Sequence, residues 1–239
     1  MTTSREKVLG DIRKALGKRA QRDEAAEAAL VARLEAHTPG TIPDRARKSE
    51  REQIRLFIQM AREAAATVEE IKTLRAVPGA VAEFLAAHNL PSAIVAAPDP
   101  ALRDVAWESR ETLEVRAGAA EPSDLTSVTT AFAGVAETGT LVLASGPGTP
   151  TTLNFMPDNH IVVLHASQIV GDYETVWAKL RERAAGNKPA GENLGKAAKK
   201  TMPRAVNWIT GPSRSADIEQ MLLMGAHGPR RLHILVVRG

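Results

Sequence analysis

Five residues near the middle of the chain, Ala136-Glu137-Thr138-Gly139-Thr140, place a carboxylate and two hydroxyls between apolar segments. A carboxylate that faces a cleft can act as an acid, a base or a nucleophile, because partial burial raises its pKa. The simpler interpretation is a tight connection between two strands, since Gly139 permits a positive φ angle. That interpretation explains the glycine but gives Glu137 no role. We therefore predict Glu137 as a catalytic residue and keep the structural turn as the alternative.

A second polar group, Asp158-Asn159-His160, directly precedes the apolar run Ile161–His165. His160 at the start of a strand can contact a ligand or stabilise a turn. The six histidines show no HxH or HxxxH spacing, and an isolated histidine is a poor metal site. The chain also has no cysteine, which excludes a thiolate nucleophile, Cys-ligated zinc and Cys-held iron–sulfur clusters on it. We predict no metal site on this chain.

The third candidate is the stretch Gly211-Pro212-Ser213-Arg214, which follows a predicted strand over Ala205–Thr210. We expect a helix over Ile218–Met224, with Ser215 as its N-cap and Asp217 in its first turn. A helix N-terminus attracts anions, and a guanidinium group binds carboxylate or phosphate through two hydrogen bonds. Ser213, Arg214 and Asp217 are therefore candidate ligand-binding residues. A capped helix with a surface arginine is the alternative.

The elements that must position these residues form a regular pattern after Thr67. Short runs of valine, isoleucine and leucine alternate with helical segments, which predicts an α/β fold with three layers and a mostly parallel sheet. The run Val128–Val135 is expected to be one continuous strand. Before this region, we expect helices over 3–17, 21–36 and 48–66. The predicted division is a helical N-terminal region, 1–66, and an α/β domain, 67–239.

The composition of the 239 residues, 44% hydrophobic and 25% charged, is ordinary for a globular protein. No apolar run reaches the roughly 20 residues of a membrane span, and the charged start favours a cytoplasmic location. Charge is uneven along the chain, with a net −9 over 76–175 and +8 over 176–239. The basic part can attract an anionic ligand. Nucleic acid is a disfavoured partner, because only 3% of residues are aromatic.

Four motifs in a fixed order resemble the LUD-domain family, and in particular its lactate utilization protein C group. The motifs are GVAETGTLVL, PDNHIVVL, ITGPSRSADIE and GAHGPRRLHILVV, and the resemblance covers about 68–239. It implies a fold like that of ribose-5-phosphate isomerase, glucosamine-6-phosphate deaminase (NagB) and the CoA transferases. The family's recurrent polar positions map onto Glu137, Thr138, Gly139, Thr140, His160, Ser213, Arg214, Asp217 and Glu219.

The resemblance also implies a function, which is the oxidation of L-lactate to pyruvate beside partner proteins that carry iron–sulfur clusters. No cofactor is expected on this chain, and its ligand is expected to be a small anionic or acyl compound. An independent isomerase or CoA-transferase-type enzyme using Glu137 is the alternative, and a regulatory nucleic-acid-binding protein is a more distant one. We predict that the three polar segments converge on one cleft at the carboxyl ends of parallel strands.

Overall fold

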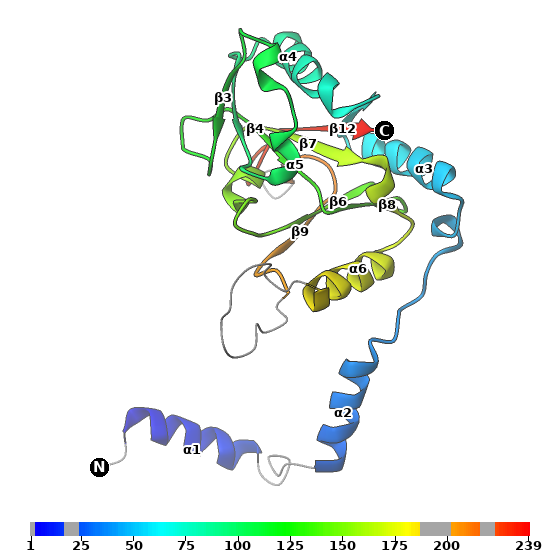
Figure 1. Ribbon diagram of the computed structural model, residues 1–239. Helices are drawn as coiled ribbons and strands as arrows, with labels where there is room; N and C mark the ends of the chain where they lie inside the picture. The colour runs from blue at the N-terminus through cyan, green and yellow to red at the C-terminus, as the bar shows by residue number, and fades with distance from the viewer. Residues whose placement is uncertain (1–2, 17–23, 187–201, 216–222) are drawn as a thin grey trace, which may run out of the picture. The chain divides into compact units, whose positions relative to one another are not determined.

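The computed structural model describes residues 3–16, 24–186, 202–215 and 223–239 (Figure 1). The chain divides into two compact units, 1–41 and 42–239. The first unit contains helices α1 (Ser4–Leu16) and α2 (Glu24–Ala36). The second unit contains the strands and the remaining helices. In the described residues, no helix is long and apolar enough to cross a membrane.

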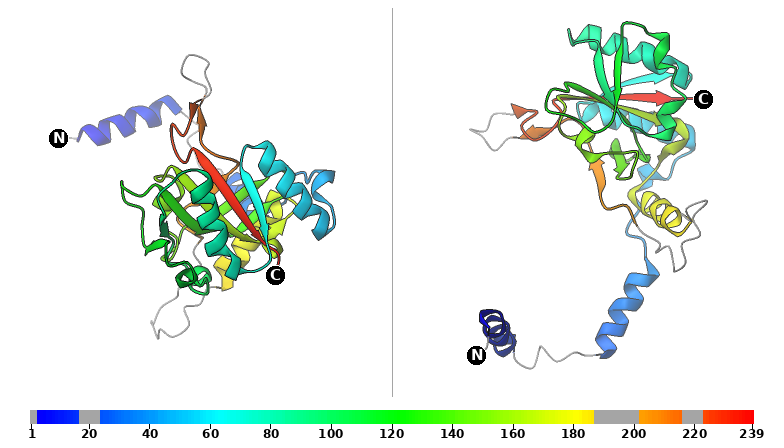
Figure 2. Two further views of the ribbon diagram at one scale, coloured as in Figure 1. Left: turned by 90° about the horizontal axis from the view of Figure 1, so that it is seen from above. Right: turned by 60° about the vertical axis from the view of Figure 1, so that its left-hand side comes forward.

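A six-stranded parallel sheet forms the centre of the second unit, in the order β1-β12-β7-β4-β2-β3 (Figure 2). Each neighbouring pair of strands is parallel. The predicted α/β class with a mostly parallel sheet is therefore confirmed. The strands are β1 (Thr67–Ile71), β2 (Ala93–Ala96), β3 (Glu114–Ala117), β4 (Thr126–Thr130), β7 (Asn159–His165) and β12 (Arg231–Val237).

The central strands β7 and β12 are buried on both faces, which explains their nearly continuous apolar sequences. Along β7, Ile161 and Val163 belong to one hydrophobic cluster, whereas Val162 and Leu164 belong to another. The first cluster includes side chains of α4 (Val77–Ala87) and α5 (Pro100–Arg103). The second includes side chains of α3 (Glu50–Glu63). Helices from separate parts of the chain thus cover opposite faces of one sheet.

Helix α3 packs against the sheet and belongs to the second unit. A capping box formed by Ser49 and Glu52 starts the helix. Four of its apolar residues recur at helical spacing and are buried: Ile54, Phe57, Ile58 and Ala61. Because this face joins the core, the compact division falls after residue 41, whereas the sequence pattern placed it after residue 66.

A second, four-stranded sheet was not anticipated. Its order is β8-β5-β6-β9, and α6 (Tyr173–Gly186) packs against it. The strands are β5 (Ala133–Val135), β6 (Thr140–Ala144), β8 (Ile169–Val170) and β9 (Val206–Ile209). Short 3₁₀ helices connect elements of the second unit: Asp44–Ala46, Leu74–Ala76, Trp107–Ser109, Thr151–Asn154 and Ala166–Gln168.

The expected single strand over Val128–Val135 is wrong, because the chain changes sheets within it. The N–H of Ala131 donates to Val163 O on β7, at 3.2 Å. The next N–H, of Phe132, donates to Val142 O on β6, at 2.8 Å. One apolar run therefore supplies β4 to the parallel sheet and β5 to the second sheet.

The expected helix at Ile218–Met224 is also wrong at the residues that can be described. Arg214–Ser215 form β10, which pairs antiparallel with β11 (Leu223–Met224). Ser215 is therefore a strand residue, paired with Leu223. Residues 216–222 lie outside the described residues. A short apolar run has no periodicity that separates a strand from a helix, so pairing with β10 decided its conformation.

Candidate functional site

A cavity of about 260 Å³ contains two of the predicted site residues, His160 and Ser213. We call it the His160–Ser213 pocket. It lies at the amino ends of β7 and β12 and beside the loop that follows β9. Its apolar wall includes Phe155, Trp208 and Leu232, and its other polar groups include Thr210 and His227. An apolar cavity with a few convergent polar groups is the usual form of a small-molecule site.

His160 is buried in β7, with its side chain bonded inside the sheet. Its Nε2 lies 2.8 Å from Thr129 Oγ1 on β4. Burial lowers the pKa of His160 to about 3, because a charged imidazole would lose its hydration. The ring is therefore neutral near pH 7, with one nitrogen as donor and the other as acceptor.

Ser213 joins the loop after β9 to the segment before β12. Its Oγ accepts a hydrogen bond from His227 N–H at 3.2 Å, and its own N–H donates to Pro229 O at 2.8 Å. Two residues earlier, Gly211 has φ 79°, and a Cβ there would meet the Ala64 carbonyl oxygen. Glycine is thus required where this loop passes the end of α3.

Glu137 lies in the hairpin between β5 and β6. It is 6% exposed, and its N–H donates to Gly171 O at 3.1 Å. Within the described residues, no hydrogen bond or ion pair engages its carboxylate, and Glu137 does not line the His160–Ser213 pocket. Gly139 has φ 66°, and a Cβ there would meet the backbone of Ala61 in α3. The turn geometry therefore accounts for Gly139.

The two threonines of the hairpin hydrogen-bond to other protein hydroxyls. Thr138 Oγ1 and Thr140 Oγ1 lie 2.7 Å apart, and each is 2.9 Å from the hydroxyl of Tyr173. Thr140 Oγ1 is also 2.6 Å from Thr210 Oγ1. Since Thr210 lines the His160–Ser213 pocket, this network places the hairpin behind the pocket wall.

The remaining predicted residues either lie apart from this cavity or fall outside the residues that the structure describes. Arg214 is exposed on β10 and does not line the pocket. Asp217 and Glu219 lie outside the described residues. His160 stands at the amino end of β7, so its predicted place at a carboxyl end of the sheet is wrong. The reason is that His160 precedes the apolar run, so it lies where the strand begins, and the amino ends of parallel strands all lie at the same edge of the sheet.

The carboxyl ends of the parallel strands form another cavity, of about 200 Å³, which sequence reasoning missed. We call it the carboxyl-edge pocket. Its polar lining is Asp99, Thr130, Thr149, His165, Gln168 and Arg183. Asp99 follows β2, Thr130 ends β4 and His165 ends β7. The available signal was a polar residue at or just after the end of each of three predicted strands, and ligands commonly bind at this edge of α/β sheets.

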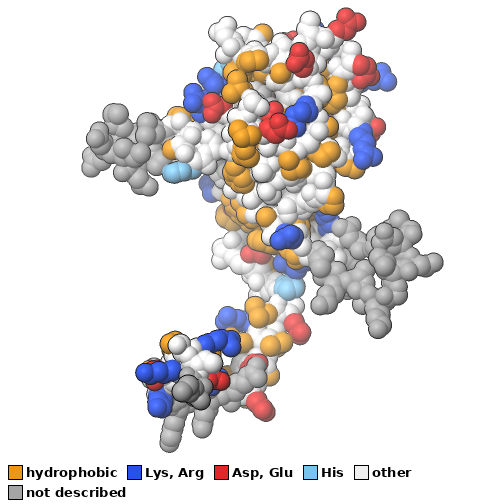
Figure 3. Space-filling model, turned by 90° about the vertical axis from the view of Figure 1, so that its left-hand side faces the viewer, with side chains coloured by type: hydrophobic (Ala, Val, Ile, Leu, Met, Phe, Trp, Pro, Cys, Tyr) orange, Lys and Arg blue, Asp and Glu red, His pale blue; other side chains and the backbone are white. Residues whose placement is uncertain are grey.

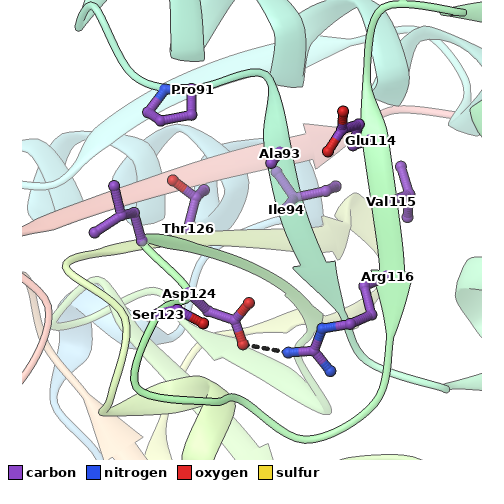
Figure 4. Close-up of a pocket in the computed structure, with 10 residues that line it drawn as sticks. Pro91, Ala93, Ile94, Glu114, Val115, Arg116, Ser123, Asp124 and Thr126 are labelled. Carbon is purple, nitrogen blue, oxygen red and sulfur yellow. Dashed lines mark hydrogen bonds and ion pairs between the residues drawn. The ribbon is translucent and has the colours of Figure 1, made fainter.

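A third cavity, of about 350 Å³, lies over β2, β3 and the start of β4 (Figure 4). Arg116 points toward Asp124 and forms an ion pair with it (Figure 4). The same guanidinium donates to Ala119 O at 3.1 Å and lies 3.5 Å from Glu121 Oε1. Because protein groups already bind this guanidinium, we assign it a structural role.

No metal centre stands out in the part of the chain that the structure describes. No cluster of three or more His, Asp or Glu side chains there could hold a metal ion. On the face in Figure 3, acidic and basic side chains of the second unit are interspersed. Nucleic-acid-binding domains instead gather lysine and arginine into a patch or stripe.

The parallel sheet and its flanking elements define an α/β protein, and a solved structure has a similar fold. This is a DUF162 family protein from Deinococcus radiodurans, with a TM-score of 0.53 and 25% identity. The match covers 80% of this chain and 99% of that one. The family model of the LUD domain matches residues 67–237. The chain therefore belongs to the LUD domain family, as its motifs predicted.

Curated relatives match over shorter stretches. A lactate utilization protein C of Halalkalibacterium halodurans is 37% identical over 118 residues, covering 49% of this chain and 46% of the relative. One from a Geobacillus species is 36% identical over 103 residues, covering 43% and 38%. An uncharacterized protein of Neisseria meningitidis is 38% identical over 104 residues, covering 44% and 38%. The matches thus span less than half of each relative.

Proposed function

We propose that this protein takes part in L-lactate utilisation, in the oxidation of L-lactate to pyruvate in the cytoplasm. The observation that carries the proposal is the LUD domain over residues 67–237, together with relatives named lactate utilization protein C. In this proposal, partner proteins hold the iron–sulfur clusters and carry the electrons. The absence of cysteine from this chain supports that division, because such clusters are held by cysteine thiolates.

The His160–Ser213 pocket is the proposed site for a small acyl compound. Phe155, Trp208 and Leu232 offer an apolar wall, and Ser213 and Thr210 offer hydroxyls that can orient a carbonyl oxygen. Among the described residues, the lining contains no lysine or arginine. This composition favours a neutral acyl group over a free anion, because an anion buried without a cationic partner is costly.

Deletion of the gene tests the pathway role. We expect the deletion strain to grow on glucose and to fail on L-lactate, and the wild-type chain to restore growth. A Ser213→Ala chain should restore growth poorly. A Ser167→Ala chain, changed at an exposed serine away from the pocket, should restore it fully. Normal growth and unchanged lactate oxidation after deletion contradict the pathway role.

Binding of a small thioester, S-acetyl-N-acetylcysteamine, tests the pocket separately. The purified wild-type and Ser167→Ala chains should bind this probe equally. Ser213→Ala should weaken binding about 5- to 10-fold, which corresponds to one hydrogen bond of about 1 to 1.4 kcal/mol. If Ser213→Ala and Ser167→Ala bind the probe equally, the acyl compound does not bind in this pocket.

An independent isomerase or CoA-transferase-type enzyme is the second candidate, and the environment of Glu137 favours it. The residue is 6% exposed, and the described residues give its carboxylate no hydrogen-bond or ion-pair partner. Such a carboxylate is available to act as a base or nucleophile. Turnover of an acyl-CoA or a sugar phosphate by the purified chain, lost in Glu137→Gln and kept in the exposed-site control Glu111→Gln, would establish this activity.

A further inference from the structure

The carboxyl-edge pocket lies where the strand order of the parallel sheet reverses. From β2 the chain moves outward to β3, and it then returns to β4 on the other side of β2. The loops after β2 and β4 therefore separate, and Asp99 and Thr130 flank the point of separation. Open parallel sheets bind ligands at such points, because the diverging loops leave a crevice there.

Arg183 brings a cation to this crevice from α6. Its guanidinium carbon lies 5.4 Å from the centre of the Phe132 ring, a distance at which a cation and a ring face attract. In the described part of the chain, no carboxylate pairs with Arg183. The guanidinium is therefore positioned by the ring, and its N–H groups remain able to bind a carboxylate through two hydrogen bonds.

Hydrogen-bond acceptors line the same cavity. Asp99 Oδ1 accepts from Ala101 N–H at 2.9 Å, and Asp99 Oδ2 accepts from the Thr130 hydroxyl. These bonds fix the carboxylate, and its remaining lone pairs can accept from a ligand. The His165 ring supplies another polar group, and its backbone N–H is fixed by Gln168 Oε1 at 2.8 Å.

We propose that the carboxyl-edge pocket binds a small 2-hydroxycarboxylate. Arg183 binds the ligand's carboxylate, Asp99 accepts a hydrogen bond from the hydroxyl on the adjacent carbon, and the His165 ring donates an N–H to the oxygen of that hydroxyl. The cavity of about 200 Å³ is smaller than the roughly 300–1,000 Å³ of sites for drug-sized ligands, which fits a ligand of a few carbons. The negative charge of Asp99 disfavours a dianion such as phosphate. The choice of lactate as the particular 2-hydroxycarboxylate rests on the proposed function. The choice of a 2-hydroxycarboxylate rests on the charges of Arg183 and Asp99 alone.

Isothermal titration of the full chain with L-lactate, propionate and inorganic phosphate tests this assignment. We expect L-lactate to bind at least 10-fold more tightly than propionate, which lacks the hydroxyl, and more tightly than phosphate. Arg183→Gln should weaken L-lactate binding at least 10-fold. Arg181→Gln, two residues earlier on α6 and outside the pocket lining, should change it less than 2-fold.

A second variant keeps the test decisive if Arg183→Gln does not fold. Asp99→Asn should bring the affinities for L-lactate and propionate within about 3-fold of each other. The proposal is overturned if L-lactate does not bind, if phosphate binds more tightly, or if Ser213→Ala abolishes binding while Arg183→Gln does not. The two proposals can fail separately. If the purified chain binds L-lactate but deletion of its gene leaves growth on lactate normal, the pathway role is refuted and this binding site stands.

Discussion

The hydroxyl oxygens of Thr140 and Thr210 lie 2.6 Å apart, so the β5–β6 hairpin is bonded to the loop that lines the His160–Ser213 pocket. These residues are 70 positions apart in the sequence. The hydroxyl of Tyr173, from α6, joins the same network. The hairpin residues thus hold the pocket wall in position without lining the pocket themselves.

Replacing Thr140 with valine removes the central hydroxyl of this network while keeping the shape of the side chain. Thr138, Tyr173 and Thr210 each lose a partner, so we expect the free energy of unfolding to fall by about 1–3 kcal/mol. Denaturant titration measures this change. Thr73→Val, at an exposed threonine outside the network, should change stability by less than about 0.5 kcal/mol. Equal effects of the two substitutions would argue against the network.

Gly139→Ala should be strongly destabilising, because two separate costs combine. The residue has φ 66°, and the added Cβ would press on the backbone of Ala61. Strain and overpacking together predict a loss of about 2–4 kcal/mol. Gly79→Ala is the control, since its Cβ would meet only the flexible Arg110 side chain. A folded Gly139→Ala chain of unchanged melting temperature would show that the hairpin packs elsewhere.

Stability should fall as pH decreases from about 6.5 toward 4. Burial lowers the pKa of His160 to about 3, and burial with the nearby charge of His88 lowers that of His233 to about 4. In the unfolded chain both titrate near 6.5, so the unfolded state binds more protons across this range. Each histidine therefore contributes a loss of about 1.4 kcal/mol per pH unit.

The slope of unfolding free energy against pH isolates His160 from other effects. His160→Gln should lower the slope between pH 6 and 4.5 by about 1.4 kcal/mol per unit, whatever it does to stability at pH 7. His227→Gln, at an exposed histidine, is the control substitution. An unchanged slope in His160→Gln would mean that His160 titrates normally in the folded protein.

Helix α3 should be required for folding, although the family match begins after it. Phe57 is fully buried against the sheet, and Phe57→Ala should cost about 3–5 kcal/mol. Arg55→Ala, at an exposed position on the same helix, is the control. A chain of residues 42–239 should unfold cooperatively at the same denaturant concentration as the full chain. Loss of cooperative unfolding in that fragment would assign the first 41 residues a structural role.

The elements of the second unit were largely predictable, because burial leaves a local mark on the sequence. The spacing of Ile54, Phe57, Ile58 and Ala61 predicted the buried face of α3. The run Ile161–Leu164 predicted a strand covered on both sides. The same kind of apolar pattern gave a wrong prediction between Val128 and Val135, where the backbone N–H groups of Ala131 and Phe132 donate to strands of different sheets. Apolar character records that a residue is buried and does not record its partner.

The candidate site was predictable in its residue types and only partly in its location. His160 and Ser213 were selected from sequence and share a pocket, while Glu137 lies in a hairpin outside its lining. Asp99, Thr130 and His165 were not selected, because each is an ordinary polar residue when taken alone. Only their common position at one edge of the parallel sheet distinguishes them.

The sequence by itself determined the family, the α/β class and the exclusion of cysteine-based chemistry, since these depend on residue types and local order. The tertiary structure decided that β4 and β5 belong to different sheets, that Arg214 lies on a strand, and that Arg183 reaches the cavity of Asp99. Those outcomes depend on contacts between residues far apart in the chain. Hydrogen-bond pairing and packing choose among many partners that a local pattern leaves equivalent.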